Sequence, residues 1–248
     1  MPAQALSGKS ALVTGGARRI GRAIALALAR AGADVATTYR TSQADAAQTV
    51  GELSALGVRA AAIACDVRSE SSVRHAVGET LAAFGRLDLL INNAAIYLSS
   101  PLDEISLEKW DAIFETNARG PFLFAREAIP HLRASRGRIV NIGSLGGLHA
   151  WPDHAHYCSS KAALHMLTQA MARAFAPEVS VNCVAPGSIV TGTPVGDDIE
   201  RAARFAEKTP MKRNGAPEDV AQAVLFFASG PGFITGQVLA VDGGLGLI

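Results

Sequence analysis

Short apolar segments alternate with longer amphipathic segments along the whole chain. Apolar runs of about four to eight residues predict buried strands, and apolar residues recurring at about 3.6 positions predict helices. The expected strands cover residues 10–14, 33–39, 58–65, 87–92, 138–142, 180–184 and 237–241. The expected helices cover residues 22–30, 43–56, 69–84, 106–133, 157–175 and 217–228. Alternation of this kind is typical of a parallel sheet with helices on both faces.

This alternation of strands and helices continues along the whole chain, so we expect residues 1–248 to form one doubly wound α/β domain with about seven strands. No interior segment rich in Pro, Gly and Ser divides the chain, and no repeat of solenoid length is present. Pro121 predicts a kink or a break in the helix 106–133. The polar segment 191–210 predicts a loop that serves as a lid over the substrate.

Charge and composition exclude several classes of protein. The 248 residues carry 23 Lys and Arg against 22 Asp and Glu, so a nucleic-acid partner is not expected. Residues 220–241 are uncharged, but Gly and Pro divide them into a helix, a turn and a strand, so no membrane span is expected. The first nine residues lack the apolar stretch of a secretory signal, and three widely spaced cysteines fit a reducing compartment. We therefore expect a cytoplasmic protein.

A glycine-containing turn at residues 14–21 lies between the first strand and its helix. Backbone N–H groups and the helix dipole can bind a pyrophosphate at this position. The turn is not a GxGxxG fingerprint, because Ala17 stands two residues after Gly15. It is not a P-loop, because Arg22 and Ala23 follow Gly21 in place of Lys and Ser or Thr. A tight turn without a ligand is the alternative for the glycines taken alone.

The second expected strand ends at Tyr39-Arg40, about twenty residues beyond the glycine turn, where an NAD-selective fold carries an acidic residue. Arg18 and Arg40 can instead bind a 2′-phosphate through charge-assisted hydrogen bonds, which favours NADP(H) over NAD(H). Solvated loop arginines are the alternative. Asp66, at the end of the third strand, is expected either to bind the adenine amino group or to cap the helix that follows.

Tyr157 and Lys161 stand four residues apart on one expected helix, and Ser144 lies thirteen residues before Tyr157. Residues i and i+4 share one helix face. A nearby ammonium lowers the pKa of a phenol from its reference value of about 10, so Lys161 is expected to make Tyr157 a proton donor near neutrality. Ser144 can hydrogen-bond the substrate oxygen, and Asn117 can hold a water that leads to Lys161.

Competing chemistries match the residues less well. Ile142 stands where a hydrolase nucleophile elbow needs glycine, and Cys158 stands where a Ser-x-x-Lys acylase needs serine. A group near Tyr157 that could bind a metal consists of His149, Asp153, His154 and His156. A polar rim around the substrate mouth is the simpler interpretation, so no metal is expected. Trp151 and Phe205 are candidate pocket residues, with core packing as the alternative.

Ordered motifs along nearly the whole chain resemble the short-chain dehydrogenase/reductase family, which has a Rossmann-like fold. They are Thr14-Gly15…Gly21, Asp66-Val67, Asn92-Asn93-Ala94-Ala95, Asn117, Ser144, Tyr157…Lys161, Pro186-Gly187…Thr191 and Ile234…Gly244. The resemblance implies a catalytic tetrad of Asn117, Ser144, Tyr157 and Lys161. With the arginines above, the expected cofactor-binding residues are Gly15, Arg18, Arg19, Ile20, Gly21, Arg40, Asp66, Val67, Asn93, Ala94, Tyr157, Lys161, Pro186, Gly187, Ile189 and Thr191.

The resemblance implies an NADPH-dependent oxidoreductase that reduces a ketone or 3-oxoacyl-type substrate to an alcohol and forms a dimer or tetramer. Arg19 stands where the family usually has glycine, and the resulting T-G-x-x-x-R-x-G turn resembles the pteridine reductases. Tyr97 adds to that likeness, whereas Ser144 is typical of carbonyl reductases. Dihydropterin reduction is therefore one alternative. A non-catalytic NADP(H)-sensing protein is another, and the complete tetrad argues against it.

Overall fold

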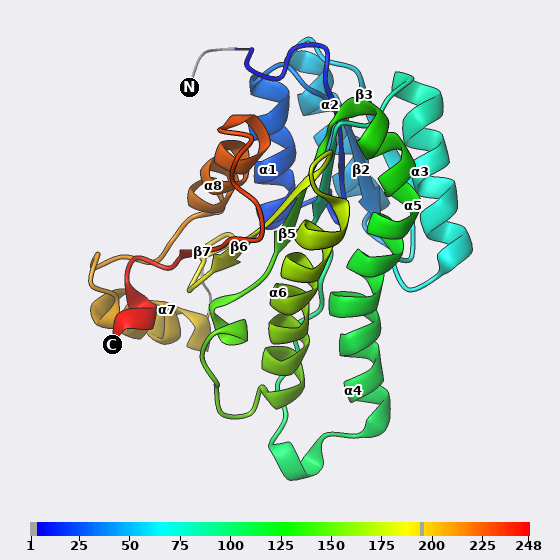
Figure 1. Ribbon diagram of the computed structural model, residues 1–248. Coiled ribbons are helices and arrows are strands. Elements are labelled where there is room, and N and C mark those ends of the chain that lie inside the picture. The colour runs from blue at the N-terminus through cyan, green and yellow to red at the C-terminus, as the bar shows by residue number, and fades with distance from the viewer. Residues whose placement is uncertain (1–3, 194–195) are drawn as a thin grey trace.

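One parallel sheet forms the centre of the molecule. The computed structural model describes residues 4–193 and 196–248 (Figure 1). Seven strands pair in parallel in the order β3-β2-β1-β4-β5-β6-β7. They are β1 (Ser10–Val13), β2 (Asp34–Tyr39), β3 (Ala60–Ala64), β4 (Leu89–Asn92), β5 (Arg138–Ile142), β6 (Ser180–Pro186) and β7 (Val238–Val241). The predicted doubly wound fold is confirmed.

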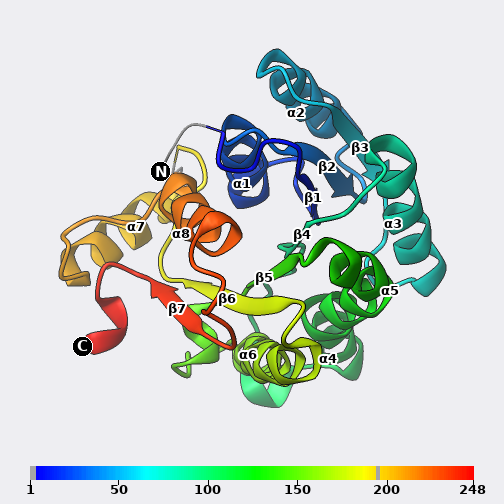
Figure 2. The same ribbon diagram turned by 45° about the horizontal axis from the view of Figure 1, so that its top comes forward.

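Helices cover both faces of this sheet (Figure 2). They are α1 (Arg19–Arg30), α2 (Gln43–Ala55), α3 (Glu70–Phe84), α4 (Leu107–Phe114), α5 (Gly120–Ser135), α6 (Ala155–Phe175), α7 (Asp197–Lys208) and α8 (Pro217–Ser229). One core cluster joins the sheet to α1, α8 and Leu53 of α2, and the other joins it to α3, α5 and α6. In β1, Ala11 and Val13 belong to the first cluster and Leu12 to the second. This alternation places the strand between two apolar layers.

The segment 191–210 differs from its prediction, because its residues Asp197–Lys208 form a helix and not a loop. An ion pair between Asp198 and Arg201 at 2.7 Å supports the first turn of α7, and Lys208 stands in the last turn, where the helix dipole favours a cation. Positions 194–195 of the predicted lid, and positions 1–3 of the predicted domain, lie outside the described residues.

Pro121 does not break the helix 106–133. The chain passes from α4 through a π-helical turn at Glu115–Arg119 directly into α5, and Pro121 stands in the first turn of α5. Proline is tolerated there because its missing N–H is not required. The uncharged run 220–241 divides into α8 and β7, as predicted. Within the described ranges, no helix has the length and hydropathy that crossing a bilayer requires.

Candidate active site

The glycine turn is fixed by the ends of two neighbouring strands. The Asn93 side chain donates to the carbonyl oxygens of Thr14 at 2.8 Å and Gly15 at 3.1 Å. The Thr14 hydroxyl accepts the backbone N–H groups of Asn93 at 2.9 Å and Ala94 at 3.0 Å. The N–H of Gly15 donates to the Thr38 hydroxyl at 3.1 Å. The carboxyl ends of β1, β2 and β4 therefore hold the turn in one position.

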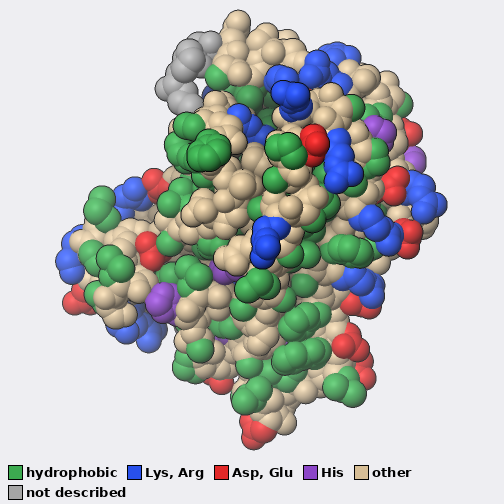
Figure 3. Space-filling view, in the orientation of Figure 1, with side chains coloured by type: hydrophobic (Ala, Val, Ile, Leu, Met, Phe, Trp, Pro, Cys, Tyr) green, Lys and Arg blue, Asp and Glu red, His purple; other side chains and the backbone are tan. Residues whose placement is uncertain are grey.

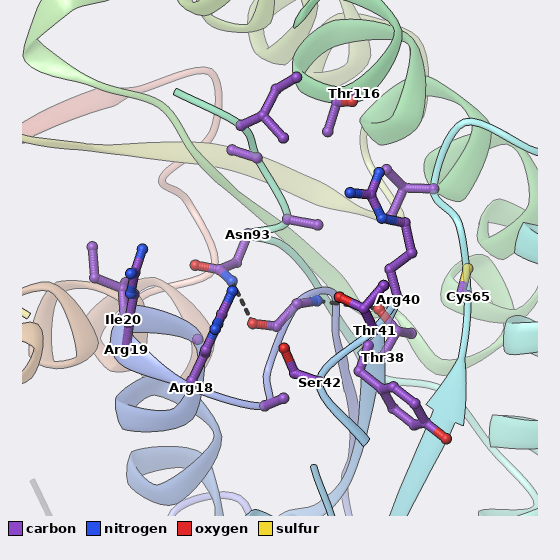
Figure 4. Close-up of a pocket in the computed structure, with 18 of the residues that line it drawn as sticks. Arg18, Arg19, Ile20, Thr38, Arg40, Thr41, Ser42, Cys65, Asn93 and Thr116 are labelled. Carbon is purple, nitrogen blue, oxygen red and sulfur yellow. Dashed lines mark hydrogen bonds between the residues drawn. The ribbon is translucent and has the colours of Figure 1, made fainter. Parts of the chain in front are cut away.

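A cavity of about 350 Å³ opens beside the turn (Figure 4). The predicted cofactor residues that line it are Gly15, Arg18, Arg19, Ile20, Gly21, Arg40, Asp66, Val67, Asn93, Ala94 and Thr191. Its walls also contain residues that were not predicted as cofactor contacts, namely Ala17, Thr38, Tyr39, Thr41, Ser42, Cys65, Ala95, Ile96 and Thr116. Arg18 and Arg19 lie on one side of the cavity, and Arg40 lies on the other (Figure 4).

The turn fits the pyrophosphate of a dinucleotide. A Cβ at Gly21 would lie 2.5 Å from the Asn93 Nδ2 and still nearer to the Gly15 carbonyl oxygen, so only glycine leaves this cradle open. The first turn of α1 carries no acidic side chain, and its positive end faces the cavity between basic walls. Arg19 has a φ of +53°, a left-handed conformation that glycine adopts with less strain than arginine.

Five predicted cofactor residues do not line the described part of this cavity. Tyr157 and Lys161 belong to α6, whereas Pro186, Gly187 and Ile189 lie at and just beyond the carboxyl end of β6. The N–H of Gly187 donates to the Val241 carbonyl at 3.0 Å, and Ile189 pairs with Gly215.

Asp66 is held as an anion by Arg68, two residues later in the sequence. Arg68 binds its carboxylate at 2.6 Å through the side chain and at 3.0 Å through the backbone N–H. These hydrogen bonds lower the pKa of Asp66 to about 2. The alternative that Asp66 caps α3 is wrong, because the Ser69 hydroxyl is the cap and accepts the Ser72 N–H at 3.4 Å.

The predicted acid-base residues lie together, but the pKa of Tyr157 differs from the prediction. Ser144, just past β5, hydrogen-bonds the Tyr157 hydroxyl, which lowers the pKa of Tyr157. Burial raises it more strongly, to about 12. Lys161 does not lower it, because its Nζ donates to the Ile142 carbonyl at 2.8 Å and lies 5.9 Å from the Tyr157 ring centroid. The phenol is therefore protonated at neutral pH.

Asn117 lies in the π-helical turn, and its side chain is fully hydrogen-bonded. Its Oδ1 accepts the Ile96 N–H at 3.0 Å, and its Nδ2 donates to the Ile96 carbonyl at 3.0 Å and to the Ser160 hydroxyl at 3.1 Å. The Asn117 side chain therefore ties the loop after β4 to α6. The predicted water at Asn117 stays a prediction.

His165 was missed by the sequence reasoning, although it follows Lys161 by four residues on the same face of α6. Its Nε2 accepts the Ser144 N–H at 3.4 Å, and a Cβ at Gly147 would lie only 2.5 Å from its ring. Burial lowers the pKa of His165 to about 4, and the nearby Lys161 ammonium adds to this effect. The neutral imidazole therefore supports the turn that carries Ser144.

Aromatic side chains surround Tyr157. Tyr97 stands perpendicular to it with ring centroids 4.8 Å apart, and Trp151 lies almost parallel at 6.3 Å. His154 stacks on Tyr97 at 4.8 Å. Among the described residues, no three His, Cys, Asp or Glu side chains are grouped so as to hold a metal ion. The metal alternative for the segment 149–156 therefore has no structural support.

The pH dependence of stability tests the burial of Lys161 without a measurement of activity. Burial lowers its pKa from 10.5 to about 8. Between these values the unfolded chain holds a proton that the folded chain has lost, so stability rises with pH there. Relative to Lys161→Met, the wild type should gain about 3 kcal/mol of unfolding free energy between pH 8 and pH 10.5. Urea unfolding of both proteins measures this difference, and a constant difference across that range would contradict the assignment.

Comparisons with known proteins agree with this geometry. The family model described as Enoyl-(Acyl carrier protein) reductase matches residues 15–246. The chain is 38% identical to the 3-oxoacyl-[acyl-carrier-protein] reductase FabG of Staphylococcus epidermidis, over 96% of this chain and 98% of that protein. It is 36% identical to 3beta-hydroxysteroid dehydrogenase 1 of Eggerthella lenta, over 98% of this chain and 95% of that protein.

Solved structures are equally similar. A short-chain alcohol dehydrogenase from Sinorhizobium meliloti 1021 superposes with a TM-score of 0.92 at 36% identity, covering 98% of each chain. A blue fluorescent protein from a metagenomic library, solved in complex with NADPH, superposes with a TM-score of 0.89 at 38% identity, covering 98% of this chain and 99% of the other. The chain therefore belongs to the short-chain dehydrogenase/reductase family and is an NAD(P)-dependent oxidoreductase, as its motifs predicted.

Proposed function

We propose that this protein uses NADPH to reduce the carbonyl group of a small ketone or 3-oxoacyl-type substrate to an alcohol. The observation that carries the proposal is the contact of Ser144 with the Tyr157 hydroxyl at the same edge of the sheet as the cavity whose glycine turn fits a pyrophosphate. The names of the similar reductases support the reaction type.

Each residue of the site has a separate role in this reaction. A bound nicotinamide dinucleotide supplies the hydride. Tyr157 donates its proton to the carbonyl oxygen, and its pKa of about 12 keeps that proton in place until a negative charge develops on the oxygen. The Ser144 hydroxyl binds the same oxygen and orients it. The Ser144 hydroxyl, which lowers the pKa of Tyr157, also stabilises the phenolate left on Tyr157, and Lys161, charged below about pH 8, binds the cofactor ribose.

The cofactor preference rests on the basic walls of the cavity. Arg40 should bind a 2′-phosphate, since its position after β2 carries a cation where NAD-selective folds carry an acid. The similar NADPH-bound structure supports this preference.

Arg40→Asp should lower the ratio of kcat/KM for NADPH to kcat/KM for NADH by about 10- to 100-fold, the size of a lost charge-assisted hydrogen bond. Steady-state kinetics with each cofactor measure the ratio. Arg173→Asp is the matched control, because it makes the same charge change on an exposed part of α6 that does not line the cavity. An unchanged ratio in Arg40→Asp would show that Arg40 does not select the cofactor.

A substrate panel tests the proposed function itself. NADPH oxidation is followed with acetoacetyl thioesters, small diketones and dihydropterins. Turnover of the first two classes supports carbonyl reduction. Turnover of dihydropterins alone would support the alternative that Tyr97 and the Arg19 turn favour, and cofactor binding without turnover of any substrate would support a sensor.

The wider organisation is also part of the proposal. We infer a single cytoplasmic domain in which the segment 191–210, including α7, covers the substrate. We also infer a dimer or tetramer, because apolar side chains gather over α4, α5 and α6 (Figure 3). Leu107, Phe122 and Met166 are exposed there by 76%, 43% and 64%.

A further inference from the structure

Tyr97 lies at the point where the cofactor cavity meets the reacting phenol. Its neighbour Ile96 lines the cavity and is fixed by Asn117, so the loop after β4 is held firmly there. His154 covers one face of the Tyr97 ring, and Tyr157 stands perpendicular to it. Tyr97 is nevertheless 57% exposed, which leaves a ring surface open to a ligand.

Trp151 forms the second wall. A Cβ at Gly146 would lie 3.0 Å from the indole, so Trp151 rests on the turn that carries Ser144. The indole is inclined by only 17° to the Tyr157 ring. A carbonyl bound by Ser144 and Tyr157 must therefore carry its substituents past Tyr97 or Trp151.

The charges near this mouth indicate a neutral ligand. Arg201 of α7 is a cation that acts on Tyr97, and it is ion-paired with Asp198 at 2.7 Å. Because Asp198 already balances its charge, Arg201 does not require an anionic group on the substrate. The surface that remains is aromatic, and aromatic rings prefer other aromatic rings in stacked or edge-to-face contact.

We propose that Tyr97 and Trp151 form an aromatic recognition site that selects flat, conjugated, uncharged carbonyl substrates over aliphatic ones. The proposal rests on the proposed carbonyl reduction and names its substrate class. Tyr97 sets the preference because its ring is exposed and lies beside Tyr157, whereas Trp151 also supports the Ser144 turn.

The kinetic test compares 1-phenyl-1,2-propanedione with its cyclohexyl counterpart, which has a similar size but no aromatic ring. Tyr97→Leu should lower the phenyl-to-cyclohexyl ratio of kcat/KM by about 2- to 12-fold, the size of one aromatic contact. Tyr97→Phe, which keeps the ring, should retain the wild-type ratio within about twofold. An unchanged ratio in Tyr97→Leu would overturn the proposal, and because it is a ratio, a general loss of activity does not affect it.

A binding test separates this inference from the proposed function. Naphthalene-2-carboxamide and its decalin counterpart are titrated into the wild type and Tyr97→Leu with NADP⁺ present, and quenching of tryptophan fluorescence is followed. Tighter binding of naphthalene that is lost in Tyr97→Leu supports the site even if neither ketone is reduced. Equal binding of the two compounds by the wild type overturns the site even if ketones are reduced. Turnover of a dihydropterin alone, with naphthalene binding intact, would keep the ring preference and reject the carbonyl as the reacting group.

Discussion

Tyr157→Phe is expected to lower kcat for NADPH-linked carbonyl reduction by about 10²- to 10⁴-fold, the usual contribution of a general acid. The substitution removes only the hydroxyl that donates the proton. The phenyl ring keeps its contacts with Tyr97 and Trp151, so the site should retain its shape. Absorbance at the NADPH band measures turnover.

Two further measurements make this result specific. The dissociation constant for NADPH, followed by its fluorescence, should stay within about twofold of the wild type, since the hydroxyl contributes little to cofactor affinity. The thermal unfolding midpoint should change little, because the substitution removes both the hydrogen bond to Ser144 and the cost of burying the hydroxyl. Turnover close to the wild-type rate would refute the assignment of Tyr157 as the proton donor.

The strands and most helices could be predicted because their apolar periodicity is local. The segment Asp197–Lys208 was missed although it has an apolar stripe at helical spacing, Ile199, Ala202, Ala203 and Ala206, because its many charged residues were interpreted as a polar loop. The π-helical turn at Glu115–Arg119 left no local signal. Proline usually indicates a break, whereas here Pro121 stands in a first turn that needs no N–H.

The cavity was predictable because the carboxyl ends of parallel strands meet at one edge of a sheet. The motifs at Gly15, Arg40, Asp66 and Asn93 follow four different strands and line the same cavity. What depends on tertiary burial was not predictable. The direction of the Tyr157 pKa shift is set by desolvation and by where the Lys161 ammonium is bonded, and neither can be read from a spacing of four residues.

The residues that pack against the catalytic side chains could not be predicted from the sequence either. The contact of His165 with Ser144 joins residues twenty-one positions apart, and its only sequence signal is the shared helix face with Lys161. Tyr97 and Trp151 meet Tyr157 only because the loops after β4 and β5 lie at the same edge of the sheet. Composition and motif spacing do not specify ring contacts of this kind.

Gly21→Ala is expected to have the largest effect on the cofactor site. The added methyl group would lie well below the 3.0 Å that real Cβ atoms keep, against the Gly15 carbonyl and the Asn93 side chain. Both neighbours belong to the clamp in which Asn93 donates to Thr14 and Gly15 at 2.8 and 3.1 Å, so neither can move without breaking it. We expect a loss of about 1–3 kcal/mol in unfolding free energy from overpacking. Affinity for NADPH should fall by at least about tenfold, since a misplaced backbone N–H loses its charge-assisted bond to phosphate.

Gly78→Ala is the matched control, because Gly78 lies in α3 with nothing within 4 Å of the added Cβ. There the same substitution should raise the unfolding free energy by about 0.5–1 kcal/mol, since alanine loses less conformational entropy than glycine in a helix, and it should leave NADPH affinity unchanged. Urea unfolding and NADPH fluorescence titration of both variants separate the general effect of a methyl group from the effect on the turn. If Gly21→Ala bound NADPH as tightly as Gly78→Ala, the turn at residues 14–21 would not be the pyrophosphate site, and the cavity would have to bind the cofactor through its arginines alone.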